Sequence, residues 1–355
     1  MNRDDFVHAL ASNRALVELD LSGMDLSHLD LSKVIFERCR MTACNLSATI
    51  LHKTSFIGVD LTGAQITEAT ITKSLFHTTK LESTNWAGCH VEDGDFSGND
   101  CQQAVFSQST LTRCDFSASN LTGANFQKAQ TQRLSMRGAI VDGLQCHETV
   151  FHRADFTGVD MQRMVLGTTD LSGANLTRAN LTGLHFQGCI LNQAKLNEAI
   201  AHDGDFRGMR LNQVFFLKAQ LEKAYFMESQ LTSCQFGEAH ASKTLWTDAH
   251  LTACFFNAAH VDRTDFSRAI LEKCIFKKAF LHAANFSDTT LSYCDLSHAD
   301  ITEALLARTK LEYTNLHAVD VHRATVRDAS MTTVLPTDPI RAQAEAFVPV
   351  QVSSR

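Results

Sequence analysis

Large apolar residues recur at every fifth position of this chain, from Leu16 to Met331, with no insertion or deletion in the phase. We call these positions centres, and nearly all of them are Leu, Phe, Ile, Val, Met or Trp. The residue two places before a centre is usually small, and the residue directly before it is often Asp or Asn. The stretch LSGANLTRANLTG, from Leu171 to Gly183, shows the unit clearly.

A period of five fits neither of the two common secondary structures. An amphipathic helix places apolar residues at i, i+3, i+4 and i+7, and a half-buried strand alternates with a period of two. A short strand followed by a turn in every unit explains the pattern. The small residue and the centre, two positions apart, then point inward, and the other three residues point outward.

The centres also show a longer period. Two series of centres are mostly aromatic, and the centres between them are mostly Leu, so the true period is ten or twenty residues. Like side chains placed over like side chains would form a dry interior stack. The first aromatic series contains Phe36, Phe56, Phe76, Phe96, Phe116, Phe216, Phe236, Phe256 and Phe276, and the second contains Phe106, Phe126, Phe186, Phe206, Phe226, Trp246, Phe266 and Phe286.

The unit resembles that of the pentapeptide-repeat family, A(D/N)LXX, over residues 16–331. The family's fold is a right-handed quadrilateral parallel β-helix with four units per coil. The resemblance therefore implies an all-β chain of about 16 coils, because a fixed period marks a stacked repeat fold. We expect an N-terminal cap with a short helix at 1–15, the β-helix at 16–331, and a C-terminal cap or tail at 332–355.

The ends of an open β-solenoid need covering, because they expose unpaired backbone groups. Residues 4–12 predict a short helix, with Asp4 or Asp5 near its N-cap. Its residues Phe6, Val7 and Leu10 are available to cover the first coil.

The C-terminal segment has a different composition. All three prolines of the chain lie after Met331, and a helix of one or two turns is predicted to start at Pro339. The segment is a cap, a dimer contact or a flexible tail, and Phe347 is its candidate contact residue.

One interior region departs from the pattern. Between residues 131 and 146 the centres Thr131 and Cys146 are small, whereas the usually small positions hold Leu134 and Leu144. Volume has moved between the two inner sites, as dense packing requires. We expect a local widening or bend here and no domain boundary.

The residues that most often carry chemistry fall into the repeat. Most of the eleven cysteines occupy the small inner position, where a thiol acts as a small hydrophobe, and no CxxC occurs. Four of them recur with the longer period and should stack in one interior column. The sixteen histidines lie mostly at outward positions, and stacked His240 and His260 lack a third ligand by spacing. We therefore predict no catalytic residue, no metal site and no cofactor. The cysteine column is Cys234, Cys254, Cys274 and Cys294.

Apolar residues at the outward position before the centre are the best candidate contacts, because this position favours Asp or Asn. Contiguous exposed apolar residues mark interaction sites. Three of them share one predicted face, a fourth lies on the next face, and two share another. In that order they are Phe215, Phe255 and Ile275, then Phe280, then Tyr225 and Leu245.

These features favour a non-enzymatic scaffold or adaptor that binds another protein, as repeat solenoids commonly do. The family resemblance adds bacterial secretion or effector systems as a possible setting. The formal net charge of -7 argues against direct nucleic-acid binding, and no apolar run could span a bilayer. The polar N-terminus predicts a cytoplasmic protein, with export by a signal-less route left open.

A second reading also comes from the resemblance, because some family members mimic B-DNA and protect DNA gyrase, a type II topoisomerase. The acidic residues for that role would be Asp95, Asp115 and Asp155. Ser135, in the same column, interrupts this acidic face, and no loop insertion occurs of the kind that gyrase-protecting members carry.

Overall fold

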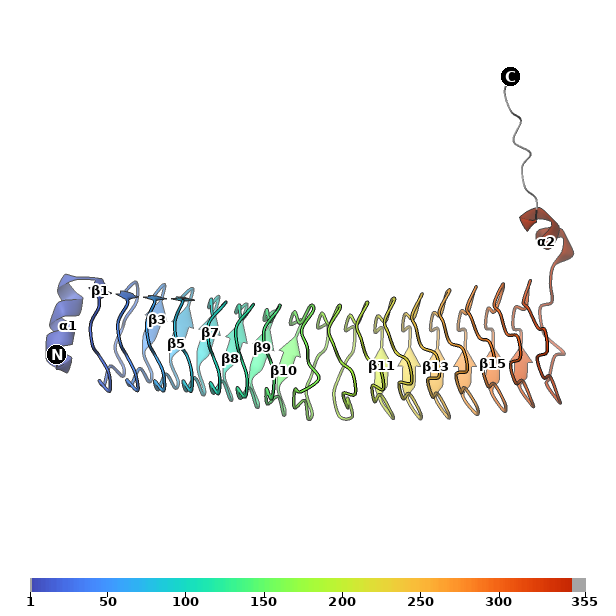
Figure 1. The fold of residues 1–355 in the computed structure, drawn as a ribbon, viewed down its shortest axis with the longest axis horizontal. Helices are drawn as coiled ribbons and strands as arrows, with labels where there is room; N and C mark the ends of the chain where they lie inside the picture. Colours follow the sequence, from blue (N-terminus) through green and yellow to red (C-terminus); the bar gives the residue numbers. More distant parts are fainter. Residues whose placement is uncertain (1, 347–355) are drawn as a thin grey trace, which may run out of the picture. The chain divides into compact units, whose positions relative to one another are not determined.

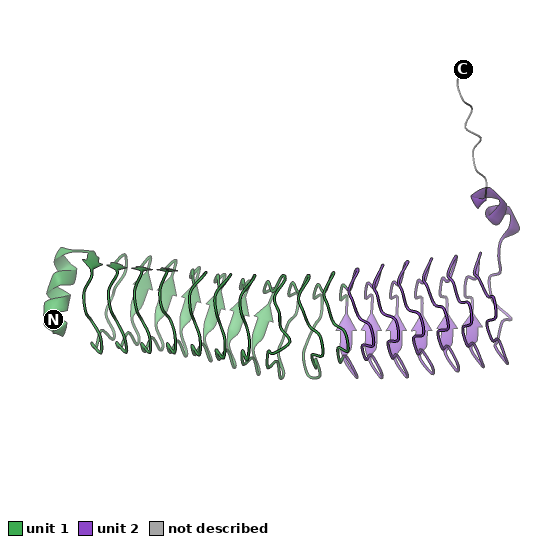
Figure 2. Cartoon of the chain, in the orientation of Figure 1, with its two compact units in different colours: residues 1–205, 213–215 green, residues 206–212, 216–355 purple. Residues whose placement is uncertain are grey.

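The computed structural model describes residues 2–346 and consists of parallel β-coils with one short helix near each terminus (Figure 1). It is a parallel β-solenoid of about 15 turns, which confirms the fold class. The chain forms two compact units (Figure 2): unit 1 holds Met1–Asp205 and Gln213–Phe215, and unit 2 holds Phe206–Asn212 and Phe216–Arg355. Among the described residues, neither helix is long and apolar enough to cross a membrane.

Unit 1 contains two parallel sheets of three-residue strands. Each strand pairs with the equivalent strand of the next coil, as Leu16 does with Phe36 and Val91 with Leu111. One coil therefore takes up four of the repeat units, as the family resemblance implies. The four-stranded sheet contains β1 (Ala15–Val17), β2 (Ile35–Glu37), β4 (Ser55–Ile57) and β6 (Leu75–His77), and the six-stranded sheet contains β3 (Ile50–His52), β5 (Thr70–Thr72), β7 (His90–Glu92), β8 (Thr110–Thr112), β9 (Gln130–Gln132) and β10 (Val150–His152).

Unit 2 contains one six-stranded parallel sheet in which the strands pair in the same register. Isolated parallel bridges with this register connect the outward rows of its other faces. Its strands are β11 (Arg210–Asn212), β12 (Gln230–Thr232), β13 (His250–Thr252), β14 (Ile270–Glu272), β15 (Thr290–Ser292) and β16 (Lys310–Glu312).

The burial pattern follows the five-residue unit. In β12 the centre Leu231 is buried, and its two strand neighbours are exposed. The small residue two positions before a centre is buried as well, as at Ala224 and Cys234. The core of each unit is therefore the stack of these two inward positions. Every strand is only three residues long because the chain must turn a corner once in each unit.

The corners use the left-handed region of backbone conformation. The residue two places after a centre has a positive φ through most of the coils, including non-glycine residues such as Lys53 at 54° and Lys273 at 55°. This conformation is costly for residues with a Cβ. Backbone hydrogen bonds between successive coils, which we call the ladder, offset this cost. At Lys53, for example, the N–H donates to the carbonyl oxygen of Thr72 in the next coil at 2.8 Å.

The aromatic centres form stacked columns inside both units. In unit 2 the ring centroids of Phe216 and Phe236 lie 4.7 Å apart with planes 6° from parallel. The second column runs through Phe226 and Trp246 and meets the first edge-on, with an angle of 84° between Phe216 and Phe226. Stacked and edge-to-face contacts both stabilise aromatic pairs. The two aromatic series in the sequence are thus two neighbouring columns of the core.

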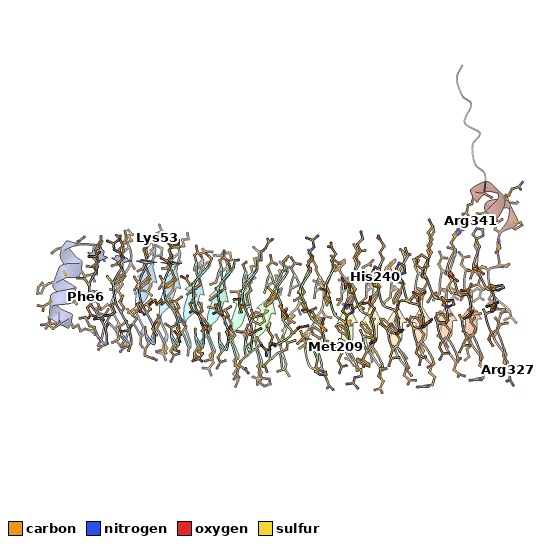
Figure 3. The ribbon with its side chains drawn as sticks, viewed as in Figure 1. Phe6, Lys53, Met209, His240, Arg327 and Arg341 are labelled. Carbon is orange, nitrogen blue, oxygen red and sulfur yellow. The ribbon has the colours of Figure 1, made fainter. Side chains whose placement is uncertain are left out.

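Helix α1 (Arg3–Ser12) covers the first coil of unit 1. Its N-cap is Asn2, whose side chain accepts the N–H of Asp5 while the Asp5 carboxylate accepts the N–H of Asn2, so Asp4 and Asp5 lie in the first turn, near the N-cap as expected. Phe6, which is labelled on α1 in Figure 3, is fully buried, and Leu10 is buried too. Val7 is 42% exposed, so it does not help to cover the coil.

Helix α2 (Pro339–Glu345) begins at the predicted proline, with Asp338 as its N-cap. None of its residues is buried, and Ile340 is 80% exposed. The last centres, Val321, Val326 and Met331, are also exposed. Within the described residues, α2 therefore leaves the last coil uncovered. Phe347, the candidate tail contact, lies outside the described residues.

The inward residues of the irregular region 131–146 are packed in the core, and the expected widening or bend stays a prediction. Leu134 and Leu144 are buried at positions that are small elsewhere, and the small centre Thr131 is buried with them. Volume has therefore been exchanged between the two inward positions. The Thr131 hydroxyl has no hydrogen-bond partner among the described residues, so this repacking leaves one buried polar group unsatisfied.

The interruption of the hydrogen-bond ladder extends further than the sequence indicates. Among the described residues of unit 1, no parallel bridge joins Ile140 to Asp160, although bridges continue on either side. The N–H of Gly143 donates to the carbonyl oxygen of Arg163, one residue later than the usual ladder partner. The displaced bond runs from Gly143, inside the region of exchanged volume, to the coil that follows it.

Candidate interaction surfaces

Where an Asp or Asn stands directly before a centre, it usually has a structural role. Its side-chain oxygen accepts the backbone N–H two residues later, at 2.8 Å from Ser117 N to Asp115 Oδ1 and 2.8 Å from Ser297 N to Asp295 Oδ1. Asn performs the same task, as Asn285 does for Ser287. Such Asx turns explain the residue preference of the unit. Because Asn serves equally well, the negative charge of Asp is optional.

The candidate acidic face therefore consists largely of turn-forming groups. Asp95, Asp115 and Asp155 are half-buried, and bridges connect Asp95 to Asp115 and Ser135 to Asp155. Asp95 Oδ1 accepts both the N–H and the hydroxyl of Ser97, at 2.9 and 2.6 Å. Arg137 lies 3.9 Å from Asp155 and offsets its charge. This row offers no unbroken acidic stripe.

Phe255 and Ile275 place apolar side chains at this position. They are paired by a parallel bridge on one face of unit 2, and both are half-buried. Neither side chain can accept the N–H two residues later, so both forgo the Asx turn. An apolar residue here gives up a local hydrogen bond and exposes apolar area, and the structure of the coils does not require it.

Phe280 lies at the end of a row of three rings on the next face. His240 and His260 stack with their centroids 4.8 Å apart, and Phe280 stacks on His260 at 4.5 Å. The sequence predicts the histidine pair, and the structure adds Phe280, which is 42% exposed, to it. His240 is labelled in Figure 3. The result is a flat, continuous aromatic row on the surface of unit 2.

Tyr225 and Leu245 are also brought together, by a parallel bridge on a third face of unit 2. Both are half-buried. The guanidinium carbon of Arg207 lies 5.8 Å from the centroid of the Tyr225 ring, a cation–π contact. This pair is thus partly covered by an arginine and presents less apolar surface than the other two groups.

Phe215 belongs to unit 1 and is described apart from the other candidates. It is 38% exposed and borders an open depression of about 580 Å³ on unit 1. The depression is otherwise polar, with Arg153, Asp155, Asn175 and Lys195 among its lining residues. Phe215 is therefore a single apolar side chain at the edge of a charged surface.

Two lysines next to the apolar residues were missed in the sequence. Lys277 and Lys278 are exposed on the coil that carries Ile275 and Phe280, and neither has an ion-pair partner in the described part of the chain. Their neighbour Lys273, by contrast, pairs with Glu272 at 3.0 Å. The sequence contains the signal that would have found them: Lys277 and Lys278 lie between Ile275 and Phe280 in the chain.

The thiols lie in the core of the two units. All eleven cysteines are buried, and burial raises the pKa of Cys44 and of Cys89 to about 12. Thiols of the predicted column face backbone carbonyl oxygens of the coil before, such as Cys274 Sγ at 3.4 Å from Leu251 O. A thiol that stays protonated is a poor nucleophile and a poor metal ligand.

One group of possible metal ligands does occur among the described residues. His298, His317 and Glu345 each place one ligand atom within 4.8 Å of the others. Two of these residues come from coils of unit 2 and the third from α2, so five-residue spacing alone could not find the group.

Comparison with known proteins agrees with the repeat pattern. A family model described as a pentapeptide repeat region matches residues 29–106. A second, described as pentapeptide repeats (8 copies), matches 100–130, 166–208 and overlapping segments from 249 to 332. Together they cover more than half of the chain. No curated protein matches the sequence.

Solved structures of similar fold have low sequence identity. QnrB1, a plasmid-mediated fluoroquinolone resistance protein, is 19% identical over 52% of this chain and 91% of its own, with a TM-score of 0.29. HetL, involved in heterocyst differentiation regulation in the cyanobacterium Nostoc, is 18% identical over 95% of this chain and 98% of its own, with a TM-score of 0.17. Since such likeness concerns the fold alone, the family models carry the assignment: the chain belongs to the pentapeptide-repeat family.

Proposed function

We propose that this protein is a non-enzymatic scaffold or adaptor that binds another protein through the outer surface of unit 2. The observation that carries the proposal is the apolar group Phe255, Ile275 and Phe280. All three stand directly before a centre, a position at which many other units carry an Asp or Asn that closes a turn. We call these three residues the unit 2 patch.

The chemistry of the patch supports protein binding. Phe280 extends a row of stacked rings, and aromatic residues dominate the energetically important centres of protein interfaces. Lys277 and Lys278 border the patch and would form a charged rim around an apolar centre. Phe215, Tyr225 and Leu245 are secondary candidates, because each presents less continuous apolar surface.

The test is a pull-down from a native-like lysate with wild type beside the Phe255→Asp/Phe280→Asp double variant. Asp is frequent directly before a centre and can form the Asx turn, so we expect the variant to fold. A partner retained by wild type and lost by the variant supports the proposal. Ile270→Asp is the matched control, because Ile270 is 42% exposed in β14 on a different face.

A partner that binds all three forms equally would contradict the proposal that the unit 2 patch is the binding surface. If topoisomerase subunits were recovered by all three and lost on changing Asp95, Asp115 and Asp155 to Lys, the DNA-mimic alternative would replace the adaptor. The Asp→Lys changes remove the Asx turns as well as the negative charges. The matching Asp→Asn variant is the control, because Asn removes the charge and keeps the turn.

The open C-terminal coil is a second contact that we propose, between two copies of the chain. Val321, Val326 and Met331 are exposed there, and in the described part of the chain no later coil covers them. Light scattering over a concentration series should show a dimer for wild type and a monomer for Val321→Lys/Met331→Lys. If wild type were a monomer at all concentrations, the proposed dimer contact would be contradicted. We propose the cytoplasm as the location of the protein.

A further inference from the structure

Three side chains that the repeat does not account for meet near the last coils of unit 2. Glu345, the last residue of α2, places its Oε2 atom 3.1 Å from Nε2 of His317 and 3.2 Å from Nε2 of His298. The two imidazole rings are 5.3 Å apart and nearly perpendicular. The three ligand atoms lie within 4.8 Å of one another.

We propose that His298, His317 and Glu345 form a binding site for a divalent transition metal ion of the zinc type. Two imidazoles and one carboxylate are a frequent protein ligand set for Zn²⁺, with a water as the fourth ligand. Bonds of about 2.0–2.1 Å in a tetrahedron separate neighbouring ligand atoms by roughly 3.3 Å. The two distances to Glu345 are close to that separation, so an ion fits after small side-chain movements.

The surroundings of Glu345 favour this use of its carboxylate. Arg341 Nε donates to the other carboxylate oxygen, Oε1, at 2.8 Å, and this bond presents Oε2 to the two histidines. Hydrogen bonds of this kind, which orient a ligand from behind, are typical of metal sites. Arg341 is labelled on α2 in Figure 3.

The burial of the three side chains leaves one side open. The His317 side chain is 2% exposed, that of His298 is 27% exposed and that of Glu345 is 38% exposed. An ion held by these atoms would rest on the buried imidazole and face solvent on the other side. That side offers a place for the water that completes the tetrahedron.

Metal binding requires one change, which gives the proposal a distinct signature. Nδ1 of His317 accepts the backbone N–H of Asp338 at 3.1 Å, so the neutral ring carries its proton on Nε2 and donates it to Glu345. A metal on Nε2 moves that proton to Nδ1, and the Asp338 N–H must then turn away. Metal binding is therefore coupled to the N-terminal end of α2.

The site would hold α2 more firmly than its own packing can. No residue of α2 is buried, and within the described residues its links to the coils are polar ones. A metal cross-link between Glu345 and the two histidines would fix the position of this helix.

The test uses the full chain, stripped with a chelator and then titrated with Co²⁺ and with Zn²⁺. Tetrahedral Co²⁺ gives a strong visible absorption, and calorimetry gives the Zn²⁺ stoichiometry. We expect one ion per chain for wild type and at least tenfold weaker binding for Glu345→Gln and for His298→Asn. His298 sits at a corner with φ 60°, a conformation that Asn tolerates, so this variant should fold.

The matched control is His322→Asn, which removes an exposed histidine from the last coil and should leave the affinity unchanged. Hydrogen exchange adds a second readout: Zn²⁺ should speed exchange at the Asp338 amide in wild type and not in Glu345→Gln. Co²⁺ without tetrahedral absorption, or affinity equal in wild type and Glu345→Gln, would overturn the proposal and leave a metal-free hydrogen-bonded cluster.

Discussion

The first coil, in unit 1, is covered by a helix, whereas no helix of the described residues covers the last coil, in unit 2. In unit 1 the centres of the first coil, such as Leu16, Leu21 and Leu26, are buried, and α1 places Phe6 and Leu10 against them. In unit 2 the last centres, such as Val326 and Met331, remain exposed, and α2 buries none of its residues. The repeat is the same at both ends, so the flanking segment alone makes the difference.

The comparison shows what a cap needs in a repeat protein. Helix α1 is tied to the coils by two bonds from Arg3, which donates to the carbonyl oxygens of Asp25 at 2.9 Å and Ser27 at 2.7 Å. Its apolar side chains then replace a missing coil. Helix α2 has polar ties and no buried apolar side chain. In a stack stabilised by neighbouring repeats, an uncovered end coil is the least stable.

The largest effect is expected from one substitution made in the same column at both ends. Leu26→Asp buries an unpaired carboxylate and should lower the free energy of unfolding of the first coils by more than about 4 kcal/mol. Val326→Asp, at a position that is 47% exposed in the single chain, should change it by only about 0.5 kcal/mol when both proteins are measured at concentrations too low for the proposed dimer. Urea unfolding followed by hydrogen exchange measures both. Equal effects would mean that the C-terminal coil is covered in solution.

Next in size is the contribution of the helices. Phe6→Ala removes a fully buried ring and should cost about 3–5 kcal/mol in the first coils. Ile340→Ala, on α2, should be nearly neutral because Ile340 is 80% exposed. Thermal unfolding of both variants beside wild type gives the comparison. A large loss for Ile340→Ala would show that α2 also acts as a cap.

A smaller effect is expected at the N-caps. Asn2→Ala removes the capping box of α1 and should cost about 1 kcal/mol, which is passed to the coils because α1 is packed on them. Asp338→Ala should fray α2 by a similar amount and leave the hydrogen-exchange rates in β16 unchanged. Faster exchange in the coils at both ends, or at neither, would contradict this coupling.

The smallest effect concerns pH. The Ser27 hydroxyl, and further hydrogen bonds and charge including Arg3, hold the pKa of Asp25 below its ordinary value. A lowered pKa contributes stability above the ordinary value, and this contribution is lost as the pH falls through the lowered one. Acid should therefore loosen α1 slightly, and Asp25→Asn should flatten this dependence in a hydrogen-exchange series. An unchanged acid response in Asp25→Asn would assign the effect to other carboxylates.

Some of the candidate sites could be predicted from the repeat, and others could not. The Phe255–Ile275 pair and the His240–His260 stack follow from equivalent positions on successive coils, and the structure brings both together. The cluster of His298, His317 and Glu345 could not be found in this way. His298 stands two places after a centre, His317 stands directly after one, and Glu345 lies outside the repeat.

By itself the sequence determined the coil, because two inward positions in every five must be filled and a single shift in phase would turn them outward. The stacking of aromatic centres follows for the same reason. The tertiary structure decided how each Asp is used, how far the irregular ladder extends after residue 140, and which end is covered. These properties depend on contacts between segments that the period does not relate, so no count along the chain could reveal them.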